Sequence, residues 1–253
     1  MSLNRRSFLL GSGLTAAGLV GASVGHSGRV EAAPIASGQS TGIPDDATFR
    51  SCRPKDSLKA LIQGNQNFVA AWQKANLATS MAARAAAMSS LWTNDCYLTA
   101  NELSTGQAPW AAILSCADSR VSPEWIFDAV PSDLFVIRSA GNTAFDDAIA
   151  SLEYCVAVLE TPLIMVMGHS TCGAVKAARD DAPLTPLLEQ LVTPIRASLT
   201  PGESLDAAIA GNARYAAGQL TKRSQVLADA VANGTLTIVV STFDIQTGQV
   251  TLL

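Results

Sequence analysis

The stretch LIMVMGHSTCGAVKAA, residues 163–178, carries the pattern from which the fold can be worked out. Its first part, Leu163–Met167, is an unbroken apolar run of the length and composition of a buried strand. Gly168 and His169 end that run, and Thr171–Ala178 has the small and apolar residues of a helix. An apolar strand followed at once by a helix is typical of a parallel sheet that helices cover on both faces.

Further apolar runs predict more strands of the same kind, and helical patterns separate them. The predicted strands are Ala111–Ser115, Leu134–Arg138 and Leu236–Ser241, and the predicted helices start at Ser57 and span about Thr79–Leu91, Asp146–Leu159, Leu184–Leu199 and Ser204–Ala232. Because strands and helices alternate, residues 57–253 are predicted to form one α/β domain with a mainly parallel sheet and helices at its N-terminal side. A short last strand, Gln249–Leu253, follows a Thr-Gly turn and is expected to pair antiparallel at the edge.

Composition narrows the possible functions. The 253 residues are 48% hydrophobic and 15% charged, which excludes a disordered chain and a small disulfide-held scaffold. The net charge of −4 gives no basic surface, so a nucleic-acid partner is not expected. With only two histidines and five cysteines in the chain, the positions of these residues limit the chemistry that the protein can perform.

The first 32 residues resemble an export signal. Arg5 and Arg6 precede Ser-Phe-Leu-Leu, and a Gly/Ala-rich apolar run continues to about Gly25, as in a Tat signal peptide. Cleavage after Val30–Ala32 would remove His26, one of the two histidines, and leave residues 33–56 as an extended arm rich in Gly, Pro, Ser and Thr. The alternative is a retained membrane anchor, although the run of roughly 18 residues is at the lower limit for a span. We therefore expect export by the Tat machinery to the periplasm or another extracytoplasmic compartment of a bacterium.

Reactive side chains follow two of the predicted strands. Cys116, Asp118 and Arg120 come directly after the first strand, and His169 and Cys172 after the third. An open α/β sheet binds its ligands at the carboxyl ends of its strands, and two thiolates with one imidazole leave a fourth position open, as in catalytic zinc sites. The alternative is two ordinary buried cysteines beside one core histidine.

These motifs resemble those of the β-class carbonic anhydrases. The paired motifs are Cys116-x-Asp118-Ser-Arg120 and Gly168-His169-x-x-Cys172-Gly173, and the likeness runs from about Leu58 to Leu253 through segments such as Ala140-Gly-Asn142, Ser151-Leu-Glu-Tyr154 and Phe243-Asp244. The resemblance implies a sheet of order 2-1-3-4 with an added antiparallel edge strand. Ala117, Ser139 and Asn67 depart from the family pattern at positions that do not coincide with the expected ligands.

The resemblance also implies the roles of the site residues. Cys116, His169 and Cys172 would bind one zinc ion per subunit, and Asp118 and Arg120 would form a catalytic dyad. The expected reaction is the reversible hydration of CO₂ to bicarbonate and a proton through zinc-bound hydroxide, with Arg120 holding Asp118 away from the metal so that the fourth position stays open.

Three further positions resemble a substrate pocket built from both subunits of a homodimer or a higher even oligomer: Gln107, Phe135 and Tyr154. On the residues alone, Gln107 is more simply a surface loop residue, and Phe135 and Tyr154 are more simply core residues, so their place in a pocket rests on the resemblance.

Other functions and other cysteine roles stay open at this point. A hydrolase of the same fold acting on carbonyl sulfide or carbon disulfide, or a non-catalytic periplasmic zinc-binding or redox protein, would share much of the pattern. Cys155 is most simply a core residue, and Cys52 and Cys96 are candidates for a disulfide in an exported protein, although their distance cannot be read from sequence.

Overall fold

The fold is described from a computed structural model, which describes residues 52–93, 96–180 and 182–253. The predicted leader, residues 1–32, and most of the predicted arm, residues 33–51, lie outside the described residues. Within the described ranges, no helix combines the length and the apolar character that a membrane span requires.

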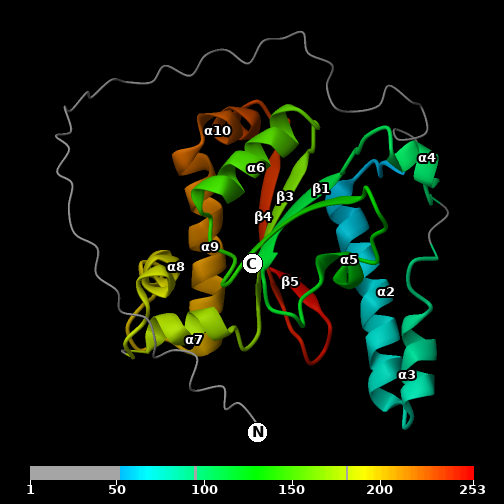
Figure 1. The fold of residues 1–253 in the computed structure, drawn as a ribbon, viewed down its shortest axis with the longest axis horizontal. Coiled ribbons are helices and arrows are strands. Elements are labelled where there is room, and N and C mark those ends of the chain that lie inside the picture. Colours follow the sequence, from blue (N-terminus) through cyan, green and yellow to red (C-terminus); the bar gives the residue numbers. More distant parts are fainter. Residues whose placement is uncertain (1–51, 94–95, 181) are drawn as a thin grey trace, which may run out of the picture. The chain divides into compact units, whose positions relative to one another are not determined.

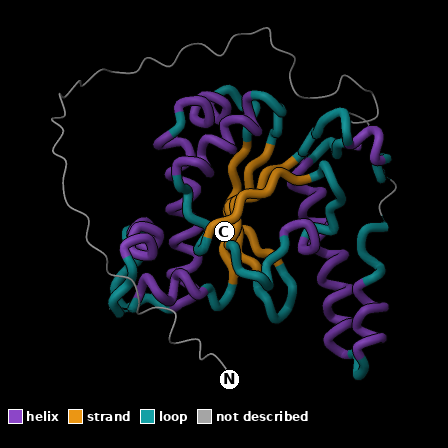
Figure 2. Tube along the Cα trace, viewed as in Figure 1, coloured by secondary structure: helices purple, strands orange, loops and turns teal. Residues whose placement is uncertain are grey.

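A five-stranded sheet forms the centre of the domain (Figures 1 and 2). Its order is β2-β1-β3-β4-β5, as the family resemblance implies, with three parallel pairings and an antiparallel one between β4 and β5. The strands are β1 (Ala111–Cys116), β2 (Leu134–Ser139), β3 (Leu163–His169), β4 (Thr237–Phe243) and β5 (Val250–Leu252). Every residue of β1 and β3 is buried, which explains why these two strands read as unbroken apolar runs.

The described residues form nine helices, and a side chain caps the start of six of them. They are α2 (Ser57–Leu77), α3 (Met81–Met88), α4 (Ala100–Leu103), α5 (Pro123–Ile126), α6 (Asp146–Ala157), α7 (Gly173–Arg179), α8 (Pro186–Arg196), α9 (Leu205–Arg223) and α10 (Gln225–Ala232). Asp56 caps α2 through the amide of Lys59, and Ser80 caps α3 in the same way. The predicted helical stretch Ser204–Ala232 is two helices, because Ser224 adopts an extended backbone and its side chain caps α10.

Helices cover both faces of the sheet, as predicted. α2 and α5 lie on one face (Figure 1), where Phe68 of α2 packs in one core with Ile113 and Met165 of the sheet. On the other face α6, α9 and α10 enclose a second core around Leu114, Leu152 and Val166, while α7 and α8 cover the carboxyl end of the sheet.

The residues before α2 are fastened to the start of β1. Cys52 and Cys96 form a disulfide with a Cα–Cα distance of 5.6 Å, which answers the question that the sequence left open. The guanidinium of Arg53 donates to the carbonyl oxygens of Ala108, Pro109 and Leu159 at 2.8–3.1 Å. Both attachments lie at the amino end of β1, the end opposite to Cys116.

Candidate metal centre

The topology brings the two reactive segments together. β1 and β3 are adjacent parallel strands, so their carboxyl ends share one edge of the sheet. Cys116 is the last residue of β1, His169 is the last residue of β3, and Cys172 is the residue from which α7 begins. Since β2 and β3 lie on opposite sides of β1, this edge is a topological switch point, where open α/β sheets bind ligands.

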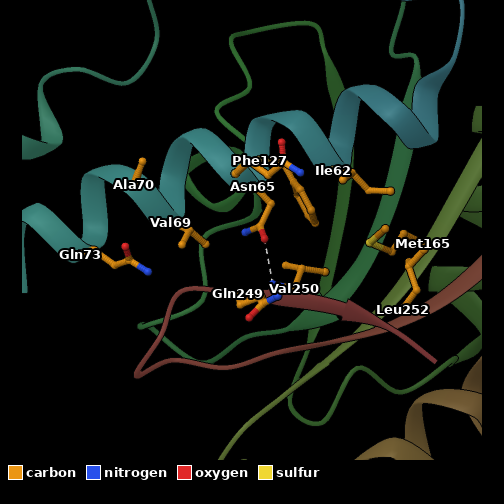
Figure 3. Close-up of a pocket in the computed structure, with 11 residues that line it drawn as sticks. Ile62, Asn65, Val69, Ala70, Gln73, Phe127, Met165, Gln249, Val250 and Leu252 are labelled. Atoms are coloured by element: carbon orange, nitrogen blue, oxygen red, sulfur yellow. Dashed lines mark hydrogen bonds between the residues drawn. The ribbon is translucent and has the colours of Figure 1, made fainter.

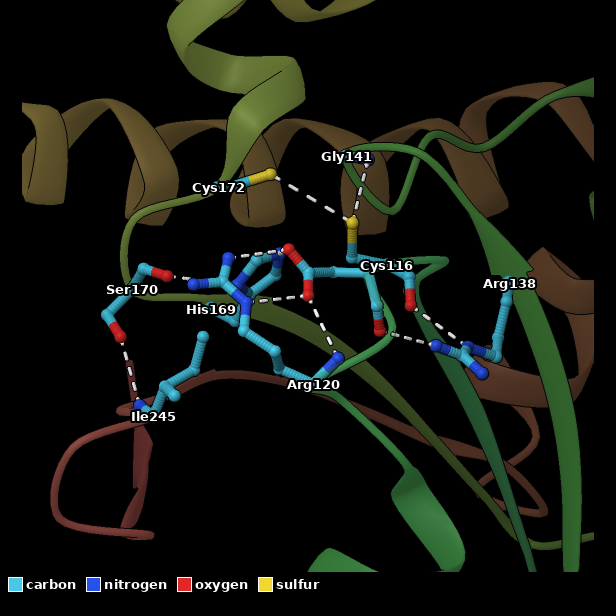
Figure 4. A network of polar contacts seen from close by, with 9 residues as sticks. Cys116, Arg120, Arg138, Gly141, His169, Ser170, Cys172 and Ile245 are labelled. Carbon is cyan, nitrogen blue, oxygen red and sulfur yellow. Dashed lines mark hydrogen bonds and ion pairs between the residues drawn. The ribbon is translucent and has the colours of Figure 1, made fainter. Parts of the chain in front are cut away.

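The three side chains form a compact and buried cluster. The two Sγ atoms and the imidazole nitrogen lie within 4.8 Å of one another, and the Sγ atoms of Cys116 and Cys172 are 4.0 Å apart (Figure 4). Tetrahedral zinc with two thiolates separates their sulfur atoms by about 3.8 Å, given Zn–S bonds of ~2.3 Å. The two sulfur atoms are therefore already close to the separation that zinc requires.

The histidine is oriented for metal binding. Nδ1 of His169 lies 3.0 Å from the carbonyl oxygen of Ser170, and because a carbonyl only accepts, Nδ1 carries the proton. The neutral ring then presents a lone pair at Nε2, which is fully buried and has no hydrogen-bond partner. A buried polar atom without a partner is costly, and a metal ion would satisfy it.

The two thiols influence each other strongly. The hydrogen bond with Cys172 lowers the pKa of Cys116, while the same interaction and burial raise the pKa of Cys172. Because the two sulfur atoms are 4.0 Å apart, these shifts belong to the pair, and the two thiols titrate together rather than as independent groups.

Asp118 and Arg120 lie beside this cluster as a bidentate pair. Nε and Nη2 of Arg120 donate to the two carboxylate oxygens of Asp118 at 2.9 and 2.7 Å, and the backbone amide of Arg120 adds a third bond at 3.0 Å. These bonds hold the pKa of the Asp118 carboxyl well below its usual range. Oδ2 of Asp118 is also 4.0 Å from Nε2 of His169, so an ionised carboxylate faces the ligand atoms without joining them.

Sequence reasoning missed the residues that support this arrangement from behind. Nε and Nη2 of Arg138, on β2, donate to the carbonyl oxygens of Cys116 and Asp118 at 3.0 and 2.7 Å, and the amide of Gly141 donates to Sγ of Cys116 at 3.2 Å (Figure 4). Both residues lie in the Arg-Ser-Ala-Gly-Asn run at the end of β2. Arg138 binds backbone carbonyl oxygens and Gly141 acts through its own amide, so no pair of reactive side chains reveals these contacts in the sequence.

The three predicted pocket residues do not join the metal cluster within one chain. Phe135 and Tyr154 lie together, with ring centroids 6.5 Å apart, and Phe135 pairs with Ala112 at the amino half of β1. Gln107 precedes β1 and is exposed, so it lies toward the end of that strand opposite to Cys116.

A surface cavity lies away from the metal cluster. A cavity of about 320 Å³ lies between α2 and β5, lined by side chains such as Ile62, Val69, Met165 and Leu252 (Figure 3). None of the metal-cluster residues lines it, so the site is defined by its donor atoms rather than by a large cavity.

Comparisons with known proteins agree with this geometry. Residues 111–250 match the family described as carbonic anhydrase. A carbonic anhydrase of Mycolicibacterium smegmatis is 34% identical over 79% of this chain and 93% of its own length, and carbonic anhydrase 2 of Mycobacterium tuberculosis is 33% identical over 79% and 92%.

Solved structures extend the likeness to the fold. A β-carbonic anhydrase of Sordaria macrospora, described as tetrameric, gives a TM-score of 0.56 at 25% identity over 60% of this chain and 84% of its own. A Coccomyxa β-carbonic anhydrase gives 0.52 at 28% identity over 68% and 81%. The family match across the whole sheet, and relatives one third identical over nearly their full lengths, place this chain in the β-class carbonic anhydrase family.

Proposed function

We propose that this protein catalyses the reversible hydration of CO₂ to bicarbonate and a proton, with one zinc ion per subunit held by Cys116, His169 and Cys172. The observation that carries the proposal is the position of Asp118. Its carboxylate lies at the edge of a buried three-ligand cluster, yet the fork of Arg120 holds both of its oxygens. A structural zinc site would use a fourth protein ligand, whereas this arrangement keeps the fourth position open.

The chemistry of the donor set fits zinc. Two thiolates and one neutral imidazole, buried and correctly spaced, are ligands that Zn²⁺ prefers over the oxygen-rich sets of Mg²⁺ or Ca²⁺. A zinc ion bound there would act as a Lewis acid and would lower the pKa of water enough to supply a nucleophile near neutral pH.

The chain's own residues then orient the reactants. Asp118 stays ionised because of its bonds to Arg120, so it can only accept hydrogen bonds. A water molecule beside the cluster would donate a hydrogen bond to Asp118, which would turn the lone pair of its oxygen toward CO₂. Arg120 holds the carboxylate in the bidentate geometry and so prevents it from becoming a fourth ligand.

We also propose that a second copy of the chain completes the substrate pocket, in a homodimer or a higher even oligomer. Gln107, Phe135 and Tyr154 lie away from the metal cluster of their own chain, and Tyr154 is 46% exposed. In this arrangement the amide of Gln107 would donate to a substrate oxygen in the partner, and the two rings would line its apolar wall. The Sordaria relative, described as tetrameric, supports an even oligomer.

Export through the Tat pathway remains a further proposal. The disulfide between Cys52 and Cys96 supports it, because such bonds persist in oxidising compartments. The test is the N-terminal sequence of the protein recovered from the periplasm. A mature chain that starts at residue 33 is expected, and a chain that retains residues 1–32 in the cytoplasm would refute the proposal.

The activity is tested by stopped-flow CO₂ hydration together with zinc analysis of the purified protein. We expect one zinc per chain and hydration that Arg120→Ala lowers by about 100-fold or more, since Asp118 is then free to enter the fourth position. Arg84→Ala, on α3, removes an arginine remote from the cluster and should leave the rate unchanged. Hydrolysis of carbonyl sulfide without CO₂ hydration, or full activity in Arg120→Ala, would overturn the proposed reaction or the role of the dyad.

A further inference from the structure

A tight turn between β2 and α6 reaches the metal cluster through its backbone. The amide of Asn142 donates to the carbonyl oxygen of Ser139 at 3.1 Å, which closes a β-turn with Gly141 at its third position. The amide of Gly141 points inward and donates to Sγ of Cys116 at 3.2 Å (Figure 4). The turn therefore supplies a hydrogen bond to one of the proposed zinc ligands.

The geometry of this turn depends on glycine. Gly141 has φ +74°, the positive value that the third position of a type II turn requires. A Cβ at this position would lie 2.6 Å from Cδ1 of Ile195 and 3.1 Å from the Cβ of Ala174. Glycine permits the turn, but its wide range of backbone angles does not by itself hold the amide on the sulfur atom.

A side chain from a distant helix fixes the other side of the same glycine. Nδ2 of Asn212, on α9, donates to the carbonyl oxygen of Gly141 at 2.8 Å, and Asn212 is only 2% exposed. The helix that carries it is tightly seated, because a Cβ on Gly168 of β3 would lie 3.0 Å from Cγ2 of Ile209. The two peptide planes that flank Gly141 are thus held by two different partners, Cys116 on the amide side and Asn212 on the carbonyl side.

We propose that Asn212 is a positioning residue for the metal centre, acting through Gly141 to keep a backbone amide donating to the Cys116 thiolate. This inference rests on the proposed zinc site. A hydrogen bond to a thiolate ligand offsets part of its negative charge, so the sulfur donates less electron density to the metal and the metal remains a stronger Lewis acid. It also fixes the direction of the sulfur atom, since outer partners orient metal ligands.

The test compares two asparagines that make the same kind of contact. Asn212→Asp replaces the amide donor by an oxygen of similar shape that faces a carbonyl oxygen. Asn65→Asp is the matched control, because Asn65 is also buried on a helix and donates to the carbonyl oxygen of a glycine, Gly248 at 2.9 Å. Asn65 lies beside β5, away from the metal cluster (Figure 3). Each full-length variant is measured for zinc affinity by competition with a chelator, and for the sulfur-to-metal charge-transfer band after substitution with Co²⁺.

We expect Asn212→Asp to weaken zinc binding by about 10- to 100-fold, as other outer-partner losses do. Its charge-transfer band should move to longer wavelength, because a thiolate that loses a hydrogen bond is easier to oxidise. Asn65→Asp should lower thermal stability but leave zinc affinity and the band unchanged. If Asn212→Asp does not fold, Asn212→Ser, which is too short to reach the carbonyl, carries the same expectations.

The outcomes separate this inference from the proposed function. Wild-type protein that binds no zinc would overturn the zinc site, and the role of Asn212 with it. Wild-type protein that binds zinc, while the Asn212 variant matches the Asn65 variant in affinity and in the band, would overturn the role of Asn212 alone.

Discussion

The disulfide between Cys52 and Cys96 closes a loop of 44 residues that contains α2 and α3. Replacing both cysteines by serine would let the unfolded chain separate these two points, while the folded chain keeps them close through other contacts. The entropy of closing a loop of this length corresponds to about 4 kcal/mol at 25 °C. We expect the double variant to lose most of that amount of its free energy of unfolding.

Urea unfolding of the zinc-loaded protein measures this loss. With a dependence on urea of ~2 kcal/mol per molar, the midpoint should fall by about 2 M. Wild-type protein treated with a phosphine reductant should fall to the same midpoint, and the reductant should not change the variant. CO₂ hydration in buffer without urea should persist, because the bridge is at the end of β1 opposite to Cys116.

Two results would refute this reasoning. A midpoint within experimental error of the wild type would show that the unfolded chain gains no freedom when the bridge is lost. If the reductant lowers the urea midpoint of the variant as much as that of the wild type, the reductant acts on the metal cluster rather than on the disulfide.

Further predictions concern packing, ionisation and the metal. Gly64→Ala should destabilise the protein by about 3 kcal/mol in thermal melts, because the added Cβ would lie 1.9 Å from the carbonyl oxygen of Phe127. Gly218→Ala is the control: nothing lies within 4 Å of its added Cβ, so it should be neutral or stabilising. Equal effects of the two substitutions would contradict the packing argument. Burial raises the pKa of the Cys155 thiol to about 11 from an ordinary value of 9.0, so the folded chain keeps a proton that the unfolded chain loses between these values. The free energy of unfolding should therefore fall as pH rises through this window, and the fall should be shallower in Cys155→Ala. If urea titrations give the variant the same dependence of this free energy on pH as the wild type, the role of Cys155 is wrong. Removing the metal with dipicolinate should lower the melting temperature, and added zinc should restore it, since an ion bound to the folded state alone stabilises it.

The fold and the ligand set were predictable because both depend on patterns local in the sequence. The residues of β1 and β3 are buried on both faces, so each strand is an apolar run that ends abruptly at a reactive residue. Such a run shows where a strand ends, and parallel strands bring their carboxyl ends together. His169 and Cys116 could therefore be placed at the same edge of the sheet, and the strand order implied by the family resemblance made them neighbours although 53 positions separate them in the numbering.

The supporting contacts were not predictable for the opposite reason. Asn212 and Gly141 are joined across 71 positions by a hydrogen bond to a backbone carbonyl, and any residue type provides such a carbonyl. The split at Ser224 depends on a side chain that caps α10 and also donates to Glu153 of α6, a tertiary contact that helical periodicity does not reveal. Propensity predicts helix on both sides of Ser224, and only packing decides that the axis changes there.

Strand geometry also explains why the proposed pocket requires a second chain. Along β2, Phe135 pairs with Ala112 while Ser139 pairs with Cys116, so four residues separate the phenylalanine from the level of the metal cluster. At ~3.3 Å per residue this is about 13 Å, farther than a phenylalanine side chain reaches. Tyr154 accompanies Phe135, and Gln107 lies farther still along the same direction. If all three residues contact CO₂, they must therefore contact it at another subunit's zinc site, and a monomeric variant should keep its metal while losing activity.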